Sequence, residues 1–163
     1  MRSDRDYLRW CLRQSKGIRL VRPSGNLAKA YLKKSRSALR SMKVNAENGI
    51  EDWAISAAYY AKYFSVYALL SNLGVKSEIH DCTIALFAYL FRGSVSPGLV
   101  EGLRRSKRDR VETQYYTGEV GLDLGEMSVE TNRFVLEMEK VLDGLNTRRI
   151  AELRENLKKD IGS

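Results

Sequence analysis

The sequence predicts an all-α protein, folded as an up-and-down antiparallel bundle of five to seven helices. Apolar residues recur at helical spacing along most of the chain, and strand-like alternation is nearly absent. The connections between the predicted helices are short, which favours antiparallel neighbours. The 163 residues fit one domain, with a basic helical extension over 1–23, a core bundle over 24–145 and a C-terminal helix over 146–163.

Seven helical segments follow from this periodicity and from the residues that start and stop helices. They are predicted at 3–16, 24–45, 51–73, 77–90, 97–115, 128–145 and 147–161. Ser24, Ser77, Ser128 and Thr147 are predicted to cap four of them, because their side chains can accept a bond from an unpaired helix amide. Pro97 is predicted at a first helical position, where its missing N–H costs nothing.

The third segment is predicted to be the central helix of the bundle. Residues 55–70 contain only three polar side chains when tyrosines are counted as apolar, and one of these is Lys62. A helix that is apolar on nearly all sides belongs in the interior. Gly74 is a suitable end for it, because glycine readily adopts the left-handed conformation. Residues 117–126 contain three glycines and are predicted to form a loop.

Positive charge is concentrated in two parts of the chain, whose net charge is +8. Residues 1–45 contain 13 Lys/Arg and 2 Asp/Glu, and no acidic residue occurs between Asp6 and Glu47. This asymmetry predicts a polyanionic partner, either a nucleic acid or an acidic protein surface. An ordinary solvated face is the alternative, although such a face mixes both signs. The predicted anion-binding residues are Lys29, Lys33, Arg36, Arg40 and Lys43 on the second helix, and Arg104, Arg105, Lys107 and Arg108 on the fifth.

Several classes of chemistry are excluded by missing motifs. With one histidine and no Cys-x-x-Cys, the chain lacks the ligands of a zinc site, and no metal or cofactor is expected. Phosphate-binding loops, dinucleotide-binding glycine motifs and the serine nucleophile elbow are also absent. Cys11 and Cys82 are too few for a disulfide scaffold and are expected in the core of a cytoplasmic protein. The longest apolar stretch is too short to span a membrane.

Three stretches of the chain resemble HEPN-domain proteins, which are small helical bundles of archaea and bacteria. Residues 52–64 read Asp-Trp-Ala-Ile-Ser-Ala-Ala-Tyr-Tyr-Ala-Lys-Tyr-Phe and resemble the family signature Asp-x-Ala-x-Ser-Arg-Ala-Tyr-Tyr-Ala-x-Phe. Residues 76–80 read Lys-Ser-Glu-Ile-His and resemble the family's Lys-x-x-His segment. Residues 110–115 read Arg-Val-Glu-Thr-Gln-Tyr and are similar to the family's Arg-x-x-Ala-Asp-Tyr. The resemblance covers about 31–145.

This resemblance implies a homodimer associated with RNA or nucleotides, of toxin–antitoxin or defence type, with a minimal nucleotidyltransferase as partner. Many HEPN toxins are similar to metal-independent RNases that use Arg-x(4–6)-His, where histidine moves protons and arginine stabilises the phosphate. Here no histidine follows Arg110, and Tyr115 and Tyr116 occupy those spacings. Tyrosine has a reference pKa near ~10 and is a poor base at neutral pH. We therefore predict binding without efficient turnover.

The candidate catalytic residues are His80, Arg110 and Tyr115. In an up-and-down bundle they are expected at one end, with Arg110 holding a phosphate, His80 exchanging protons and Tyr115 stacking on a base. Tyr60 and Tyr116 are added as RNA contacts. Two other functions stay open: a metal-independent RNase that uses His80 with Arg110, and a structural oligomerisation partner of a nucleotidyltransferase. A packing role is the simplest alternative for His80.

Overall fold

The computed structural model describes residues 4–117 and 119–161, and within these ranges the chain forms seven helices and one two-stranded sheet. The elements are α1 (Asp4–Arg13), β1 (Arg19–Leu20), α2 (Gly25–Glu47), α3 (Glu51–Leu73), β2 (Val75–Lys76), α4 (His80–Leu90), α5 (Pro97–Tyr115), α6 (Leu124–Asp143) and α7 (Thr147–Ile161). Residue 3 of the predicted first helix and residue 118 of the predicted loop lie outside the described ranges. The all-α bundle is confirmed.

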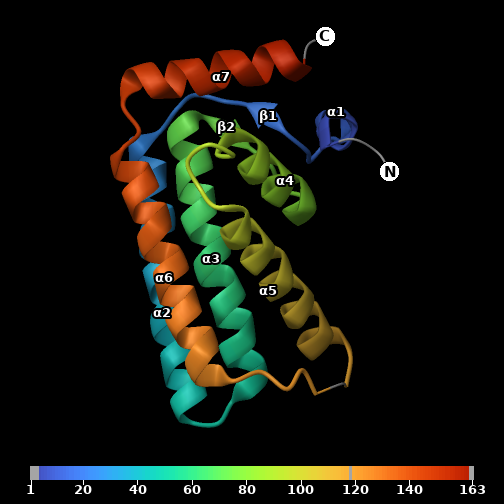
Figure 1. The fold of residues 1–163 in the computed structure, drawn as a ribbon, viewed down its shortest axis with the longest axis vertical. Coiled ribbons are helices and arrows are strands. Elements are labelled where there is room, and N and C mark those ends of the chain that lie inside the picture. Colours follow the sequence, from blue (N-terminus) through green and yellow to red (C-terminus); the bar gives the residue numbers. More distant parts are fainter. Residues whose placement is uncertain (1–3, 118, 162–163) are drawn as a thin grey trace.

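The long helices are arranged around α3. Figure 1 shows α2 and α6 alongside α3, α5 diverging from it, and α7 laid across one end of the bundle. Between Ile55 and Leu70 every residue is buried except Tyr60 and Phe64, which are half-buried. The prediction of a central helix is therefore confirmed. Gly74 ends α3 in the left-handed conformation, with φ of 71°, as predicted.

Helix starts were predicted with mixed success. Ser24 caps α2 by accepting a hydrogen bond from the amide of Leu27, and Pro97 opens α5, so both predictions are confirmed.

The tertiary fold also makes β1 pair with β2 in antiparallel register, with Arg19 opposite Lys76. Strands of two residues are too short to produce a detectable alternation of apolar and polar residues, and this sheet was not predicted.

The three other predicted caps are wrong. Ser77 lies two residues before the N-cap of α4, which is Ile79, and its carbonyl accepts a hydrogen bond from the Tyr67 hydroxyl of α3. Ser128 lies inside α6, which starts earlier because Asp123 accepts a hydrogen bond from the third following amide. Thr147 is the first residue of α7, and the asparagine before it makes the capping bond.

The two cysteines are buried as predicted, but they are not free thiols. Cys11 and Cys82 form a disulfide that joins α1 to α4. Because α1 packs on α4, their Cα atoms come within 5.7 Å of each other, a separation that suits a disulfide. A count of two cysteines carries no information about this proximity. The bond also removes the basis on which a reducing compartment was expected.

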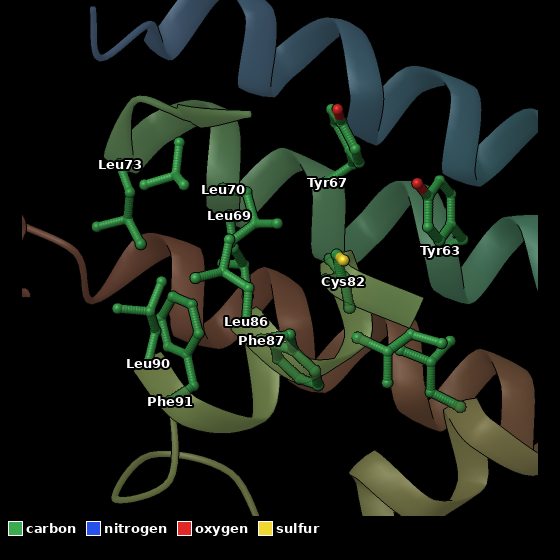
Figure 2. Packing of buried hydrophobic residues seen from close by; sticks show 14 of the residues in the cluster. Tyr63, Tyr67, Leu69, Leu70, Leu73, Cys82, Leu86, Phe87, Leu90 and Phe91 are labelled. Carbon is green, nitrogen blue, oxygen red and sulfur yellow. The ribbon is translucent and has the colours of Figure 1, made fainter. Parts of the chain in front are cut away.

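The main core fixes α4 against α3. Figure 2 shows Leu86 and Phe87 of α4 in the same buried cluster as Leu69 and Leu70 of α3. A smaller apolar cluster, which includes Met42 of α2, fills the space near the start of α3. Since α4 is held along its length, the position of its first residue relative to α3 is fixed as well.

Candidate functional site

His80 is the first residue of α4 and lies against the middle of α3, not at an end of the bundle. Its Nδ1 is 2.5 Å from the hydroxyl of Tyr59, and its ring stacks on Tyr63 with ring centroids 4.3 Å apart. The predicted place at one end is wrong because residues 75–79 carry the chain back from Gly74 along α3. Nε2 of His80 has no hydrogen-bond partner among the described residues and is not fully buried, so a ligand can reach it.

Tyr59 connects His80 to Arg110. Its side chain is fully buried; its hydroxyl meets His80, and its ring lies under the Arg110 guanidinium at 5.1 Å from the ring centroid. This distance is typical of a cation–π interaction. Burial raises the pKa of Tyr59 far above its ordinary value, and neighbouring Tyr63 adds to the rise. Tyr59 is therefore a phenol, not a phenolate, at any physiological pH.

Arg110 is held by neutral groups only. Its Nη1 donates to the Tyr60 hydroxyl at 3.3 Å and to Oε1 of Gln114 at 2.9 Å, and its carbon Cζ lies 5.4 Å from the Tyr60 ring centroid. Its Nε is buried without a hydrogen-bond partner. Among the described residues no carboxylate forms an ion pair with it. An arginine whose charge is not neutralised is suited to bind a phosphate or carboxylate.

The surroundings keep His80 neutral. Burial lowers the pKa of His80, the positive charges of Arg110 and Lys107 lower it further, and Asp81 opposes the shift. Lys107 itself forms an ion pair with Asp81 at 2.6 Å. The imidazole is therefore uncharged at pH 7, and it becomes positive only when the pH falls below the ordinary pKa of a histidine side chain.

The structure brings His80 and Arg110 together, but it does not place Tyr115 with them. Tyr115 is 71% exposed and makes no ring contact or hydrogen bond with another described residue. Tyr116 is also exposed, and it lines a small hollow with Thr113. Gln114, the residue before Tyr115, contacts Arg110 instead, because residues four apart on a helix lie on the same face. Tyr60, Tyr59 and Gln114 thus complete the site.

The basic stripe on α2 is exposed along its whole length. Of its five residues, Arg36 pairs with Glu139 at 2.8 Å and Lys43 approaches Glu47 at 3.8 Å. The remaining members have no ion-pair partner in the part of the chain that the structure describes: Lys29, Lys33 and Arg40. Positive charge that is not paired in this way attracts polyanions.

The predicted basic residues on α5 are mostly paired. Arg105 forms a forked pair with Glu130, Arg108 pairs with Glu101, and Lys107 pairs with Asp81. Arg104 has no ion-pair partner among the described residues. Of the predicted basic residues, those without an ion pair among the described residues therefore lie mainly on α2.

Lys62 is a buried charge whose partners the sequence does not indicate. Its side chain is 1% exposed; Nζ donates to Ser106 at 2.7 Å and to Glu130 at 3.1 Å. These groups border a hollow of about 280 Å³ that also contacts Asp109. Burial lowers the pKa of Lys62, and Glu130 opposes the shift. The network ties α3 to α5 and α6, and its partners lie too far along the sequence for local patterns to show them.

No group of three or more histidine, cysteine, aspartate or glutamate side chains could hold a metal ion in the described ranges. No described helix is both long enough and apolar enough to cross a membrane.

The fold and the site together define a class of protein: a small all-α bundle whose central helix, α4 and α5 converge on a histidine and an arginine joined by tyrosines. Comparison with known families is more specific. The model of the HEPN domain matches residues 28–144, more than two thirds of the sequence, and the chain belongs to the HEPN-domain family. Membership indicates a nucleotide- or RNA-related function, since HEPN domains are often RNase toxins or defence proteins, and they commonly bind RNA and dimerise. Among curated proteins, none matches this chain.

Proposed function

We propose that this chain is an RNA- or nucleotide-associated HEPN module of toxin–antitoxin or defence type, which holds a phosphate at His80 and Arg110 without efficient turnover. The contact between Tyr59 and His80 carries the proposal. Tyr59 keeps its proton, and among the described residues Nδ1 of His80 is the only hydrogen-bond partner of its hydroxyl. The phenol therefore donates to Nδ1, and the neutral imidazole carries its own proton on Nε2.

An imidazole in this form binds an anion better than it accepts a proton. Its free position, Nε2–H, can donate a hydrogen bond to a phosphate oxygen, whereas a general base needs a lone pair there. Arg110 adds a positive charge that none of the described carboxylates neutralises, and hydrogen bonds from charged donors are the strong ones. Homodimerisation and a minimal nucleotidyltransferase partner are part of the same proposal, and they rest on family membership.

A metal-independent RNase is the second candidate, and one observation favours it. Burial lowers the pKa of His80, and the charges of Arg110 and Lys107 lower it further, so the ring is neutral at pH 7, as a base must be. Cleavage would require the other tautomer of His80, with its proton on Nδ1 and a free lone pair on Nε2. Tyr59 would then accept a hydrogen bond from Nδ1 instead of donating one to it. This rearrangement is the reason why we rank the RNase second.

The test is incubation of the purified protein with labelled single-stranded RNA in the presence of a chelator, scored for binding and for cleavage. We expect binding without cleavage. Arg110→Ala should weaken binding by about 1.5–3 kcal/mol, roughly 10- to 150-fold, because a charged donor to phosphate is lost. Arg110→Lys is the control that keeps the charge but loses the planar fork. Cleavage that survives chelation and is lost in His80→Ala would establish the RNase instead.

The pH dependence separates a binding histidine from a packing histidine. Because the pKa of His80 lies below its ordinary value, protonation occurs only as the pH falls through the acidic range, and it adds a positive charge beside the phosphate. RNA affinity should therefore rise as the pH falls below 6.5, the ordinary pKa of histidine, and this rise should be smaller in His80→Gln. Equal pH profiles of the two proteins would show that His80 does not contact the ligand.

The α2 stripe predicts a strong salt dependence. Reversing Lys29, Lys33 and Arg40 to glutamate should lower RNA affinity at least tenfold and reduce the slope of log K against log salt by about 2, at ~0.7 per phosphate contact. Reversal of Lys140, Arg148 and Lys158, which already have acidic partners, is the matched control with the same change in net charge. Equal losses in both triple variants would mean that only net charge matters and that the stripe is not the binding surface.

A further inference from the structure

A second feature beside the Arg110 site has no role in the function argued so far. Between α2 and α3 lies a hollow of about 470 Å³, bordered by Trp53, Tyr60 and Phe64 of α3 and by small residues of α2. Its size is within the range of small-molecule sites. The hollow exists because the α2 residues that face these rings, Ala38 and Ser41, are too small to fill the space between the helices.

Trp53 is the most unusual residue at this hollow. Its indole is 63% exposed, and no described residue stacks on its ring or accepts a hydrogen bond from its Nε1. A tryptophan normally buries much of its large apolar surface, and an exposed ring at the edge of a hollow offers a flat surface on which an external group can stack. Tyr60 and Phe64 provide further aromatic surface, with their rings stacked at 5.6 Å.

The hollow shares its wall with the site at Arg110. Gln114 accepts a hydrogen bond from Arg110 through Oε1 and donates one to Ser56 through Nε2 at 2.9 Å, and both Gln114 and Ser56 border the hollow. The Tyr60 hydroxyl accepts from Arg110 while its ring borders the hollow. The aromatic surface and Arg110 are therefore linked by direct contacts through Tyr60 and Gln114.

Positive charge lies near the hollow, and polar groups border it. Lys34 of α2 does not line the hollow itself, but it lies over the ring of Phe64, which does, with Nζ 5.2 Å from the ring centroid. Asn45 and Ser41 provide amide and hydroxyl groups on the α2 side. A ligand that suits this combination is flat and aromatic, has hydrogen-bonding edges and carries negative charge nearby. A base with its phosphate has all these properties.

We propose that the hollow between α2 and α3 binds a nucleobase of single-stranded RNA, stacked against Trp53, while the adjoining phosphate lies at Arg110. This inference rests on the proposed function and adds to it the part of the ligand that gives base contact. Stacking on aromatic side chains contributes to single-strand binding for every base, so the hollow favours unpaired RNA without strict sequence preference.

The experiment compares two probes on the same protein: a fluorescein-labelled 12-nucleotide single-stranded RNA, and a ribose-phosphate strand of equal length without bases. We expect the wild type to bind the RNA about 5- to 150-fold more tightly than the abasic strand, the range that stacking of one base provides. Trp53→Ala should abolish this difference, and Ala38→Leu, which fills the hollow and leaves every aromatic ring in place, should reduce it. Leu136→Ala, an exposed apolar residue on α6, is the matched control and should change nothing.

Fluorescence provides an independent readout. The chain has two tryptophans, so a Trp10→Phe protein reports on Trp53 alone. RNA should quench this emission, and the abasic strand should not. Equal affinity for the two probes, with no effect of Trp53→Ala, would overturn the inference and leave the proposed function standing.

If neither probe binds at low salt, the proposed function and the inference both fail. If Trp53→Ala changes the oligomeric state measured by light scattering, but not the preference for bases, the hollow belongs to a contact between two copies of the chain and the inference is wrong. Thermal melting of each variant checks that the fold is intact, which is expected for an exposed position such as 53.

Discussion

Replacing Ala61 by aspartate should leave the chain unfolded. Ala61 is completely buried in α3, and its carbonyl accepts a hydrogen bond from Ser35 of α2 at 2.7 Å, so the two helices are in close contact there. A carboxylate at this position would lose its hydration without gaining a partner. Burial of an unpaired charge costs several kcal/mol, which is comparable to the whole stability of a domain, about 5–15 kcal/mol.

Far-ultraviolet circular dichroism and thermal melting test this expectation. Leu69→Asp, at another fully buried position of α3, should have the same effect, while Ala30→Asp on the exposed side of α2 is the matched control and should melt within a few degrees of the wild type. A cooperative melt of Ala61→Asp with native helix content would show that α3 is not central to the bundle.

Loss of the disulfide should have the second largest effect. Cys11 and Cys82 are 71 residues apart in the sequence, and the cross-link restricts the unfolded chain by an amount that corresponds to about 4 kcal/mol. Urea denaturation of the oxidised protein should therefore have a midpoint well above that of the double variant Cys11→Ala/Cys82→Ala. Addition of a thiol reductant should lower the wild-type midpoint to nearly that of the variant.

The double variant is its own control, because its midpoint should not respond to reductant. If the wild type is also unaffected by reductant, either the bond is not formed in solution or it remains inaccessible in the native state. Alkylation of the unfolded protein with a thiol reagent distinguishes these cases, because only a free thiol is modified. Modified cysteines in protein unfolded without reductant would contradict the disulfide.

Local sequence signals predicted the elements well and the long-range contacts poorly. The bounds of α3 were predicted because an uninterrupted apolar run and a terminal glycine are local features. The start of α6 was misplaced because Asp123 and Ser128 are both good caps, and periodicity alone does not choose between them. The return of the chain after Gly74 depends on packing against α3, so the place of His80 along that helix could not be predicted.

Only part of the candidate site was predicted, again because contacts between distant residues leave no local signal in the sequence. The resemblance pointed to His80 and Arg110, and the structure brings them together. Tyr59 belongs to the helix that was predicted to lie in the interior, and it is indeed buried, but its hydroxyl and ring also join the two residues. No pattern in the sequence indicates this role, because His80 and Tyr59 are 21 residues apart and lie on different helices. The pairing of Lys62 with Glu130 spans 68 residues and was equally hidden.

Arg154 of α7 has a mechanical consequence for the bundle. Its Nη1 donates to the carbonyls of Val21, Leu73 and Gly74, at 3.0, 2.7 and 2.7 Å, and so fastens α7 to the end of α3. The strand pair and α1 gather at this same end in Figure 1, while the opposite end has only the connections after α2 and α5. The two ends therefore differ in strength. When the bundle is pulled or partly denatured, it should fray from the turn between α2 and α3, and the end closed by α7 should be the last to separate.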